Sequence, residues 1–193
     1  LIYAAKSAGA DAVKFQAYKA DRVISKFASK AQYQKNQLRD EESQLDMLRK
    51  LELRDEDYFD LVNYSKEQGI LFLSTPKDIE SAKFLETINM EIFKIGSSEI
   101  NNFPFLEYLS VLKKPLILST GMCTIDEVSE AVSTINKDSQ NELYLLHCVS
   151  QYPSPIDQIN LRSIITMREK YDLDVGYSDH TIGNEAILAA VSL

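Results

Sequence analysis

The chain has 193 residues, of which 45% are hydrophobic, so it is long and apolar enough to bury a substantial core. Its net charge of −8 argues against an extended nucleic-acid surface, and no apolar run approaches the roughly 20 residues of a membrane-spanning helix. The two cysteines, Cys123 and Cys148, lie far apart in the sequence without a CxxC pair, which favours a reducing, cytoplasmic location over a secreted disulfide framework.

Short apolar segments alternate with amphipathic segments along the whole chain. The amphipathic segments have the three-to-four residue apolar spacing of helices that pack on a sheet. This alternation favours parallel βα units over hairpins or a helix bundle. The predicted strands are residues 11–16, 70–74, 91–96, 115–120, 142–148 and 173–178. The main predicted helices are residues 56–68, 79–87, 125–135 and 161–171.

The regular spacing of these units predicts an α/β fold, namely an incomplete (β/α)₈ barrel of about six βα units, because complete barrels usually need about 250 residues. The chain starts inside a helical pattern without a capping residue and ends on one without a stop signal, so we expect residues 1–193 to be one partial barrel domain without its first and last strands. A doubly wound open sheet is the alternative. It is weakened because the sequence has no GxGxxG or other glycine-rich phosphate loop.

One connection is unusually long. Residues 18–44 form a polar excursion, and residues 45–53 a short predicted helix, between the first two strands. Loops of that length are uncommon unless they are functional. Because the loops after barrel strands build the active site, we expect this one to cover the site as a partial lid. A solvated, charged insertion is the alternative.

Two lysines occupy equivalent places in two predicted strands. In residues 11–16, Lys14 and Gln16 share one face while the apolar residues share the other, and Lys94 has the same place in residues 91–96. A buried ammonium group needs an anion, which is either a protein carboxylate or a ligand. Hydroxyl side chains follow the strands at the same ends and favour a cradle for phosphate or carboxylate. They are Ser74, Thr75, Ser97, Ser98, Ser119 and Thr120.

The two histidines have different settings. His147 lies inside a predicted strand, where we expect it to pack with its nitrogens satisfied by neighbouring polar groups, so it is given no role. His180 follows the last predicted strand beside Asp179, at the end where barrel enzymes keep their catalytic loops. It could be a metal ligand or an acid-base group, but a single histidine makes no metal site, and capping is an equally good reading.

Six motifs, in order along the chain and each at a predicted strand end, resemble the sialic acid synthase family of N-acetylneuraminate, legionaminate and pseudaminate synthases. They are AGADAVKFQ (8–16), FLSTP (72–76), FKIGSSEINNFP (93–104), KPLILSTGM (114–122), LLHCVSQYPSP (145–155) and GYSDHT (176–181). The resemblance implies a phosphoenolpyruvate-dependent transferase that condenses this substrate with an N-acylated amino sugar, either N-acetylmannosamine or a diacetamido-trideoxyhexose. It also implies a homodimer with a small antifreeze-like C-terminal domain, which is absent here.

Site residues follow from the resemblance, motif by motif. The residues that it places around phosphoenolpyruvate are Lys14, Thr75, Lys94, Ser97 and Ser119. Those that it places against the amino sugar are Gln16, Glu99 and Tyr152. Catalytic roles fall to Lys14, Lys94 and Glu99, with Glu99 stabilising positive charge or orienting water. Substrate contacts are expected from the lid as well, where Tyr33, Gln34 and Asn36 lie.

The resemblance further implies that His180 binds a catalytic divalent metal, expected to be Mn²⁺, with Mg²⁺ or Co²⁺ as alternatives. The second histidine ligand and an upstream acidic residue would fall outside this chain. One departure concerns the substrate site: some sialic acid synthases have an asparagine two residues before the tyrosine of the YP motif, whereas this chain has Ser150 before Tyr152. The shorter side chain at this substrate-binding position puts N-acetylmannosamine in doubt as the acceptor.

Two other readings stay open. A lysine aldolase or lyase would form a Schiff base on Lys14 or Lys94 and would need no metal. A non-catalytic binding protein would keep the barrel without its chemistry. For the synthase we expect phosphoenolpyruvate and amino-sugar partners, with no nucleic acid and no membrane.

Overall fold

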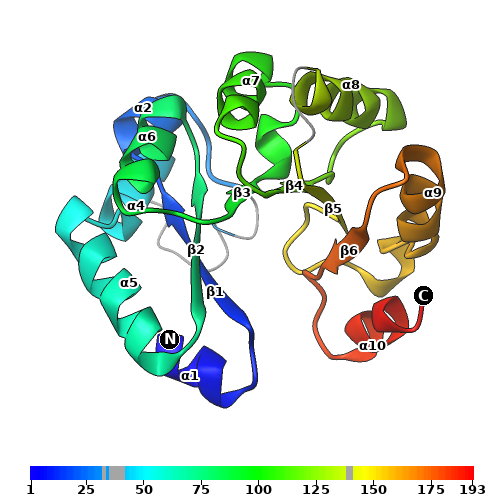
Figure 1. Cartoon of the computed structure of the whole chain (residues 1–193), viewed down its shortest axis with the longest axis horizontal. Coiled ribbons are helices and arrows are strands. Elements are labelled where there is room, and N and C mark those ends of the chain that lie inside the picture. The colour runs from blue at the N-terminus through cyan, green and yellow to red at the C-terminus, as the bar shows by residue number, and fades with distance from the viewer. Residues whose placement is uncertain (32–33, 35–41, 138–140) are drawn as a thin grey trace. The chain divides into compact units, whose positions relative to one another are not determined.

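The computed structural model describes residues 1–31, 34, 42–137 and 141–193, and in it strands alternate with helices along the chain (Figure 1). All strand pairings described are parallel, and the strands follow one another in chain order. The chain divides into two compact units, Leu1–Met90 and Glu91–Leu193. The fold is therefore of the predicted α/β class, with parallel strands.

The first unit holds two parallel strands and the helices that pack on them. Helices α5 and α6 contact β2, while α1 contacts both β1 and α5. In this unit the structure has α1 (Ile2–Ser7), β1 (Ala12–Ala17), α2 (Ala20–Val23), α4 (Gln44–Leu51), α5 (Asp55–Gln68), β2 (Leu71–Pro76) and α6 (Ile79–Thr87). The predicted short helix of the long excursion is thus confirmed as α4.

Local sequence signals set the ends of these helices. Ser43 caps α4 by accepting the N–H of Asp46 at 3.0 Å, and Asp78 caps α6 by accepting the N–H of Ser81 at 2.6 Å. Helix α5 ends at Gly69, whose φ of +64° is the left-handed conformation that closes many helices. Because α5 stops at Gly69 and α6 starts after Asp78, only short connections separate these helices from β2.

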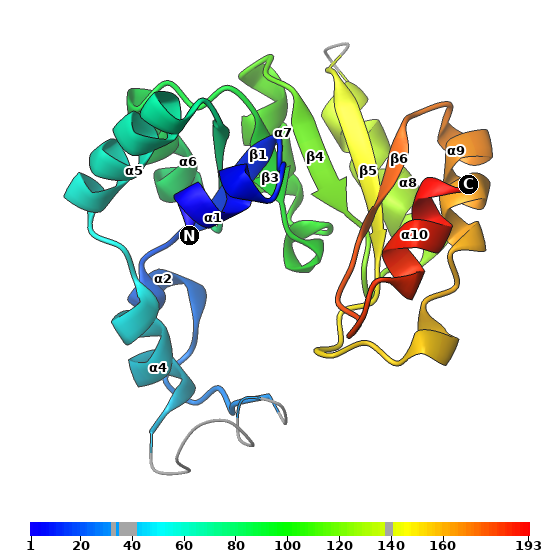
Figure 2. The same ribbon diagram turned by 90° about the horizontal axis from the view of Figure 1, so that it is seen from below.

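The second unit holds four parallel strands, of which β4, β5 and β6 run side by side in Figure 2. Helix α9 contacts β5 and β6, and α7 packs on α8. In this unit the structure has β3 (Phe93–Ile95), η1 (Ser97–Glu99), α7 (Phe103–Val111), β4 (Leu116–Ser119), α8 (Ile125–Asn136), β5 (Leu143–Cys148), η2 (Ile156–Gln158), α9 (Arg162–Tyr171), β6 (Val175–Ser178) and α10 (Glu185–Val191).

One face of these four strands forms the core of the second unit. Its side chains are apolar and have no more than 7% of their surface exposed: Phe93, Ile95, Leu116, Leu118, Leu143, Leu145 and Val175. The opposite face carries Lys94, Ser119, Cys148 and Ser178, as the strand registers require. The sheet therefore separates an apolar, helix-covered side from a side that bears polar groups.

Helix α7 is an element that the apolar spacing did not predict, because its residues are apolar almost all round. It begins with Phe103 and Pro104. Proline is favoured in a first helical turn because backbone N–H groups there have no acceptor within the helix, so the N–H that proline lacks costs no hydrogen bond. Among the described residues, no helix has both the length and the apolar composition needed to cross a bilayer.

We expect Leu145→Ala to lower the free energy of unfolding by about 2–5 kcal/mol, because Leu145 is fully buried on the apolar face and its loss leaves a cavity. The measurement is urea unfolding followed by circular dichroism. Val111→Ala, at a residue that is 63% exposed, is the matched control and should change stability by less than about 0.5 kcal/mol. Equal losses in the two variants would contradict this view of the core.

Candidate functional site

In the first unit, three predicted site residues lie on one face of the β1–β2 pair. Gln16 is the register partner of Thr75, and Lys14 is the partner of Leu73, so the side chains of Lys14, Gln16 and Thr75 point to the same side. Phe15 and Phe72 stack on the other side with ring centroids 5.5 Å apart. The structure thus confirms that these three residues share a face.

Thr75 has a buried hydroxyl group without a partner. Its side chain is 4% exposed, and within the described ranges its Oγ1 forms no hydrogen bond. Ser74, on the opposite side of β2, is fully buried and has an unbonded Oγ as well. A buried hydroxyl that makes no hydrogen bond costs about 1–3 kcal/mol. Because Thr75 faces the same side as Lys14, a ligand bound there would supply its missing partner.

The ammonium group of Lys14 lies in an unfavourable electrostatic setting. Its side chain reaches solvent, yet the protein atoms packed around it lower the pKa of Lys14, and the positive charge of Lys77 lowers this pKa further. Of the residues that the structure describes, none forms an ion pair with Lys14. An anion bound next to Lys14 would therefore stabilise its charged form.

In the second unit, Lys94 lies on the polar face of β3 with 8% of its surface exposed. Its Nζ donates to the Ser119 Oγ at 2.5 Å and to the Ile95 carbonyl oxygen at 2.8 Å. Two of the predicted phosphoenolpyruvate residues are therefore in direct contact. The relation of Lys94 to Lys14, which lies in the other unit, stays a prediction.

Ser97, Ser150 and Gly121 form a tightly packed cradle beside this pair. Ser97 Oγ accepts the Gly121 N–H at 2.8 Å and lies 3.3 Å from Cys148 Sγ. A Cβ atom added to Gly121 would lie 2.3 Å from Ser150 Oγ and 2.8 Å from Cys148 Sγ. Glycine is therefore required at position 121. The resemblance named the two serines, whereas Gly121 is a structural requirement that only the chain's path reveals.

The two cysteines, which are distant in the sequence, both contact Ser97. Cys148 Sγ lies against the Ser97 hydroxyl, and Cys123 Sγ contacts the Ser97 carbonyl oxygen at 3.9 Å and donates to the Gly121 carbonyl oxygen at 3.0 Å. Burial raises the pKa of Cys123 to about 11, and the negative charge of Glu127 contributes. Because a thiol with this pKa stays protonated at neutral pH, Cys123 is a weak nucleophile. Both cysteines are free.

Glu99 is held in place by neutral donors. The Ser98 hydroxyl donates to its Oε1 at 3.0 Å, and the Asn102 amide donates to its Oε2 at 3.1 Å. These contacts orient the carboxylate without neutralising its charge, which suits a group that stabilises a developing cation. Glu99 is half-buried in the short helix η1 that follows β3, and its role in a substrate site stays a prediction.

His180 has the hydrogen bonding of a metal-binding histidine. Its Nδ1 donates to the Val149 carbonyl oxygen at 2.6 Å, which leaves Nε2 with its lone pair as the ligand atom. Its ring packs on that of Tyr152 with centroids 4.2 Å apart. His147 instead donates through Nε2 to the Ile159 carbonyl oxygen at 2.6 Å, as expected for a packed strand residue. In the described parts of the chain no group of three or more His, Cys, Asp or Glu side chains forms a metal centre.

Asp179, next to His180, is ionised in the folded protein. Burial works against its charge, but the hydrogen bonds from Thr181, whose N–H donates at 2.9 Å, hold the pKa of Asp179 below its usual range. Burial also raises the pKa of the nearby Tyr177 hydroxyl to about 12, and the charge of Asp179 adds to this. The loop therefore keeps a carboxylate close to the proposed metal ligand.

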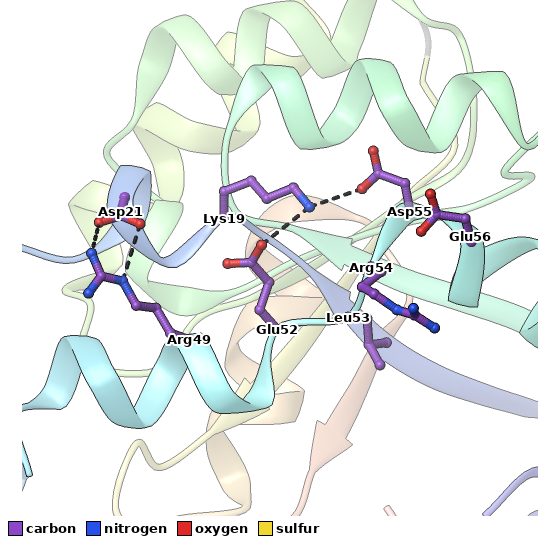
Figure 3. A pocket seen from close by; sticks show the side chains of 8 residues that line it. All are labelled: Lys19, Asp21, Arg49, Glu52, Leu53, Arg54, Asp55 and Glu56. Carbon is purple, nitrogen blue, oxygen red and sulfur yellow. Dashed lines mark hydrogen bonds and ion pairs between the residues drawn. The ribbon is translucent and has the colours of Figure 1, made fainter.

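A polar cavity of about 570 Å³ lies where the long excursion meets α5 (Figure 3). Lys19 in its wall pairs with Glu52 at 3.2 Å and with Asp55 at 3.0 Å, and Arg49 pairs with Asp21 at 2.5 Å. Because these cations already have carboxylate partners and none of the predicted site residues lines the cavity, we do not assign it to the substrates. Its ion pairs instead fix the two ends of the excursion to each other.

The predicted lid contacts are described only in part. Tyr33 and Asn36 lie outside the described residues. Gln34 is described, and its side-chain oxygen accepts the N–H of Ala31 at 2.8 Å. The role of this segment as a lid stays a prediction.

Comparison with known proteins identifies relatives over the whole chain. A model of the NeuB family matches residues 1–193. An N,N'-diacetyllegionaminic acid synthase from Campylobacter jejuni is 44% identical over 100% of this chain and 58% of the relative. One from Legionella pneumophila is also 44% identical, over 95% of this chain and 52% of the relative. The chain thus spans little more than half the length of these relatives.

Solved structures agree with the fold. An N-acetylneuraminic acid synthetase from Leptospira borgpetersenii, in complex with citrate, has a TM-score of 0.86 at 33% identity, over 99% of this chain and 62% of that one. A 3-deoxy-D-arabino-heptulosonate 7-phosphate synthase from Thermotoga maritima, with a TM-score of 0.66 at 14% identity over 93% of this chain and 57% of that one, shares the fold alone. The predicted barrel-type fold is confirmed. From the match along its full length, the chain belongs to the NeuB family, the family of the sialic acid synthases.

Proposed function

We propose that the intact protein condenses phosphoenolpyruvate with an N-acylated amino sugar and water to form a nonulosonic acid and phosphate. One observation carries this proposal: Lys14, which has no ion-pair partner in the described parts of the chain, shares a strand face with the buried, unbonded hydroxyl of Thr75. A cation and a free hydroxyl donor on one face suit a small phosphorylated substrate. Relatives over the whole chain are named as synthases of nonulosonic acids.

The chemistry forms one carbon–carbon bond. The methylene carbon of phosphoenolpyruvate attacks the aldehyde carbon of the open-chain sugar, whose oxygen takes up a proton. Positive charge then develops at the carbon that bears the phosphate, and the Glu99 carboxylate, which neutral donors hold in place, stabilises it or orients the incoming water. Water adds to this carbon, its carbon–oxygen bond to phosphate breaks, and a 2-keto acid remains.

Lys14, Lys94 and Ser119 bind and orient phosphoenolpyruvate in this proposal. The contact of Lys94 with Ser119 fixes the ammonium group on the polar face of β3 before the substrate arrives. Such preorganisation reduces the entropy that is lost when the reacting carbons are brought together. The Ser97 hydroxyl, whose oxygen accepts the Gly121 N–H, supplies a further donor just beyond the end of β3.

A divalent metal would have one ligand in His180, because the Nδ1 bond to Val149 leaves Nε2 as an imidazole donor. When bound, such a metal acts as a Lewis acid on the sugar aldehyde. Tyr152, which packs on the His180 ring, would then lie next to the acceptor, in agreement with its predicted role.

The diacetamido-trideoxyhexose is the acceptor that we favour. The legionaminic acid synthases are 44% identical to this chain, whereas the human N-acetylneuraminate-9-phosphate synthase is 31% identical. Ser150 packs against Gly121, and its side chain is shorter than the asparagine that some sialic acid synthases have at this position. A cytoplasmic homodimer is the state in which we expect the enzyme to work, and its free cysteines suit that compartment.

We expect the intact protein to release phosphate from phosphoenolpyruvate only when an N-acylated amino sugar and Mn²⁺ are both present. A panel with N-acetylmannosamine and a diacetamido-trideoxyhexose, assayed for phosphate and for nonulosonic acid, tests the reaction and the acceptor together. A chelator should abolish both signals, and added Mn²⁺ should restore them. Phosphate release that is independent of the sugar would refute the proposal.

The lowered pKa of Lys14 is the observation that favours the alternative, a Schiff-base aldolase, because a neutral amine is the nucleophile in that chemistry. The two readings differ in a direct test. Borohydride with pyruvate should leave the mass of the protein unchanged if it is a synthase. A stable adduct on Lys14, together with activity in the presence of a chelator, would establish the aldolase instead.

We expect Lys94→Met to raise the KM for phosphoenolpyruvate about 10-fold to 100-fold, since a hydrogen bond to a charged group contributes about 1.5–3 kcal/mol. Steady-state kinetics measure the effect. The control is Lys83→Met, at an exposed lysine on α6 that pairs with Glu80 at 2.8 Å. An unchanged KM in the Lys94 variant would exclude Lys94 from substrate binding.

We expect His180→Ala to weaken Mn²⁺ binding at least about tenfold, because ligands and their supporting groups each change metal affinity by at least this factor. Free Mn²⁺ measured by electron paramagnetic resonance gives the affinity without relying on turnover. His147→Asn, at the histidine that bonds the Ile159 carbonyl, is the control and should keep the affinity. Equal Mn²⁺ binding by wild type and His180→Ala would remove His180 from the metal site.

A further inference from the structure

Lys77 continues the polar face of β2 just beyond the end of that strand. Its N–H donates to the Ala17 carbonyl oxygen at 3.1 Å, which extends the ladder between β1 and β2 by one step. Because side chains alternate along an extended chain, Lys77 lies on the same side as Thr75, and therefore on the side of Lys14 and Gln16. Neither the strand pattern nor the family resemblance singled out this residue.

Lys77 has no carboxylate partner among the residues that the structure describes. Several other lysines of this unit do have carboxylate partners. The adjacent Asp78 is already engaged, since its Oδ1 accepts the Ser81 N–H at 2.6 Å and its Oδ2 pairs with Arg22 at 2.9 Å. Lys77 is only partly exposed, so solvent screens its charge incompletely.

Three features of this face call for the same kind of ligand. Lys14 and Lys77 are close enough for the charge of Lys77 to lower the pKa of Lys14, and packing around Lys14 lowers that pKa more strongly still. On the same face, the Thr75 hydroxyl is buried and forms no hydrogen bond within the described residues. The two ammonium groups repel each other, and the Thr75 hydroxyl lacks an acceptor. A bound dianion would offset this repulsion and accept the hydrogen bond of the hydroxyl.

We propose that Lys77 is a further substrate-binding residue, and that its ammonium group contacts the phosphate of phosphoenolpyruvate together with Lys14 and Thr75. This inference rests on the proposed function and adds a residue to its substrate site. The two negative charges of a phosphate dianion balance the two ammonium groups. A carboxylate in the same place would balance only one of them. Lys77 is placed as a binding residue, with no part in bond making or breaking.

The test is calorimetric titration of the intact protein with phosphoenolpyruvate. For Lys77→Met we expect a dissociation constant about 10-fold to 100-fold higher than that of wild type, as for the loss of one charge-assisted contact to phosphate. Lys77→Arg, which keeps the charge, should recover most of the affinity. Lys83→Met should bind like wild type, because Lys83 lies on α6 and is paired with Glu80. Lys77→Gln serves if the methionine variant does not fold.

Two kinetic readouts separate binding from a merely structural effect. Loss of Lys77 should raise the KM for phosphoenolpyruvate while leaving kcat and the KM for the sugar nearly unchanged. Phosphoenolpyruvate affinity should also fall as the pH rises through the pKa of Lys14, since the charged form binds. Removing the like charge of Lys77 raises that pKa, so the alkaline limb should move to higher pH in Lys77→Met and stay in place in Lys83→Met.

Unchanged phosphoenolpyruvate affinity in both Lys77→Met and Lys77→Gln would overturn the inference. An increase confined to the KM for the sugar would overturn it as well, because it would place Lys77 at the acceptor. If wild type binds phosphoenolpyruvate in a Lys77-dependent manner but makes no nonulosonic acid, the proposed function fails and the binding site stands. If wild type binds no phosphoenolpyruvate, both proposals fail.

Discussion

The site depends on the alternation of side chains along parallel strands. Each strand that sends one residue towards the helices must send the next one to the opposite side. In the second unit the helix side is filled by residues such as Phe93 and Leu118, and Lys94 and Ser119 are thereby forced to the other side. The same rule places Lys14 opposite Phe15 in the first unit. Burial of the core therefore determines where the cations and hydroxyls gather.

In the described part of the chain, the apolar pattern of the sequence was sufficient to predict the six strands and the main helices to within two residues at every end. It was not sufficient for α7, because a helix that is apolar almost all round has no amphipathic pattern. The shared face of Lys14 and Gln16 could be predicted from strand alternation, whereas Thr75 was named by the resemblance and its place on that face comes from the strand register. The contact of Cys123 with Ser97 could not, because it depends on the path of the loop after β4.

Backbone carbonyl oxygens give the two histidines their different characters. Both donate one N–H to a main-chain oxygen at 2.6 Å, but the bond uses Nδ1 in His180 and Nε2 in His147. In His180 the outer nitrogen, Nε2, forms no hydrogen bond with the residues that the structure describes, while in His147 the same nitrogen bonds the Ile159 carbonyl. From the sequence, His147 was expected inside a strand and His180 just after one, and the structure places them so. Which nitrogen is engaged depends on loops that the pattern of residues does not encode.

The close packing of Gly121 against Ser150 has a consequence for how this family can diversify. A Cβ on residue 121 and the Oγ of residue 150 would clash at 2.3 Å from each other. The two positions therefore compete for one volume, and a change at either is tolerated only when the other leaves space. Any exchange of residue 150, where this chain departs from some sialic acid synthases, is therefore coupled to the size of residue 121.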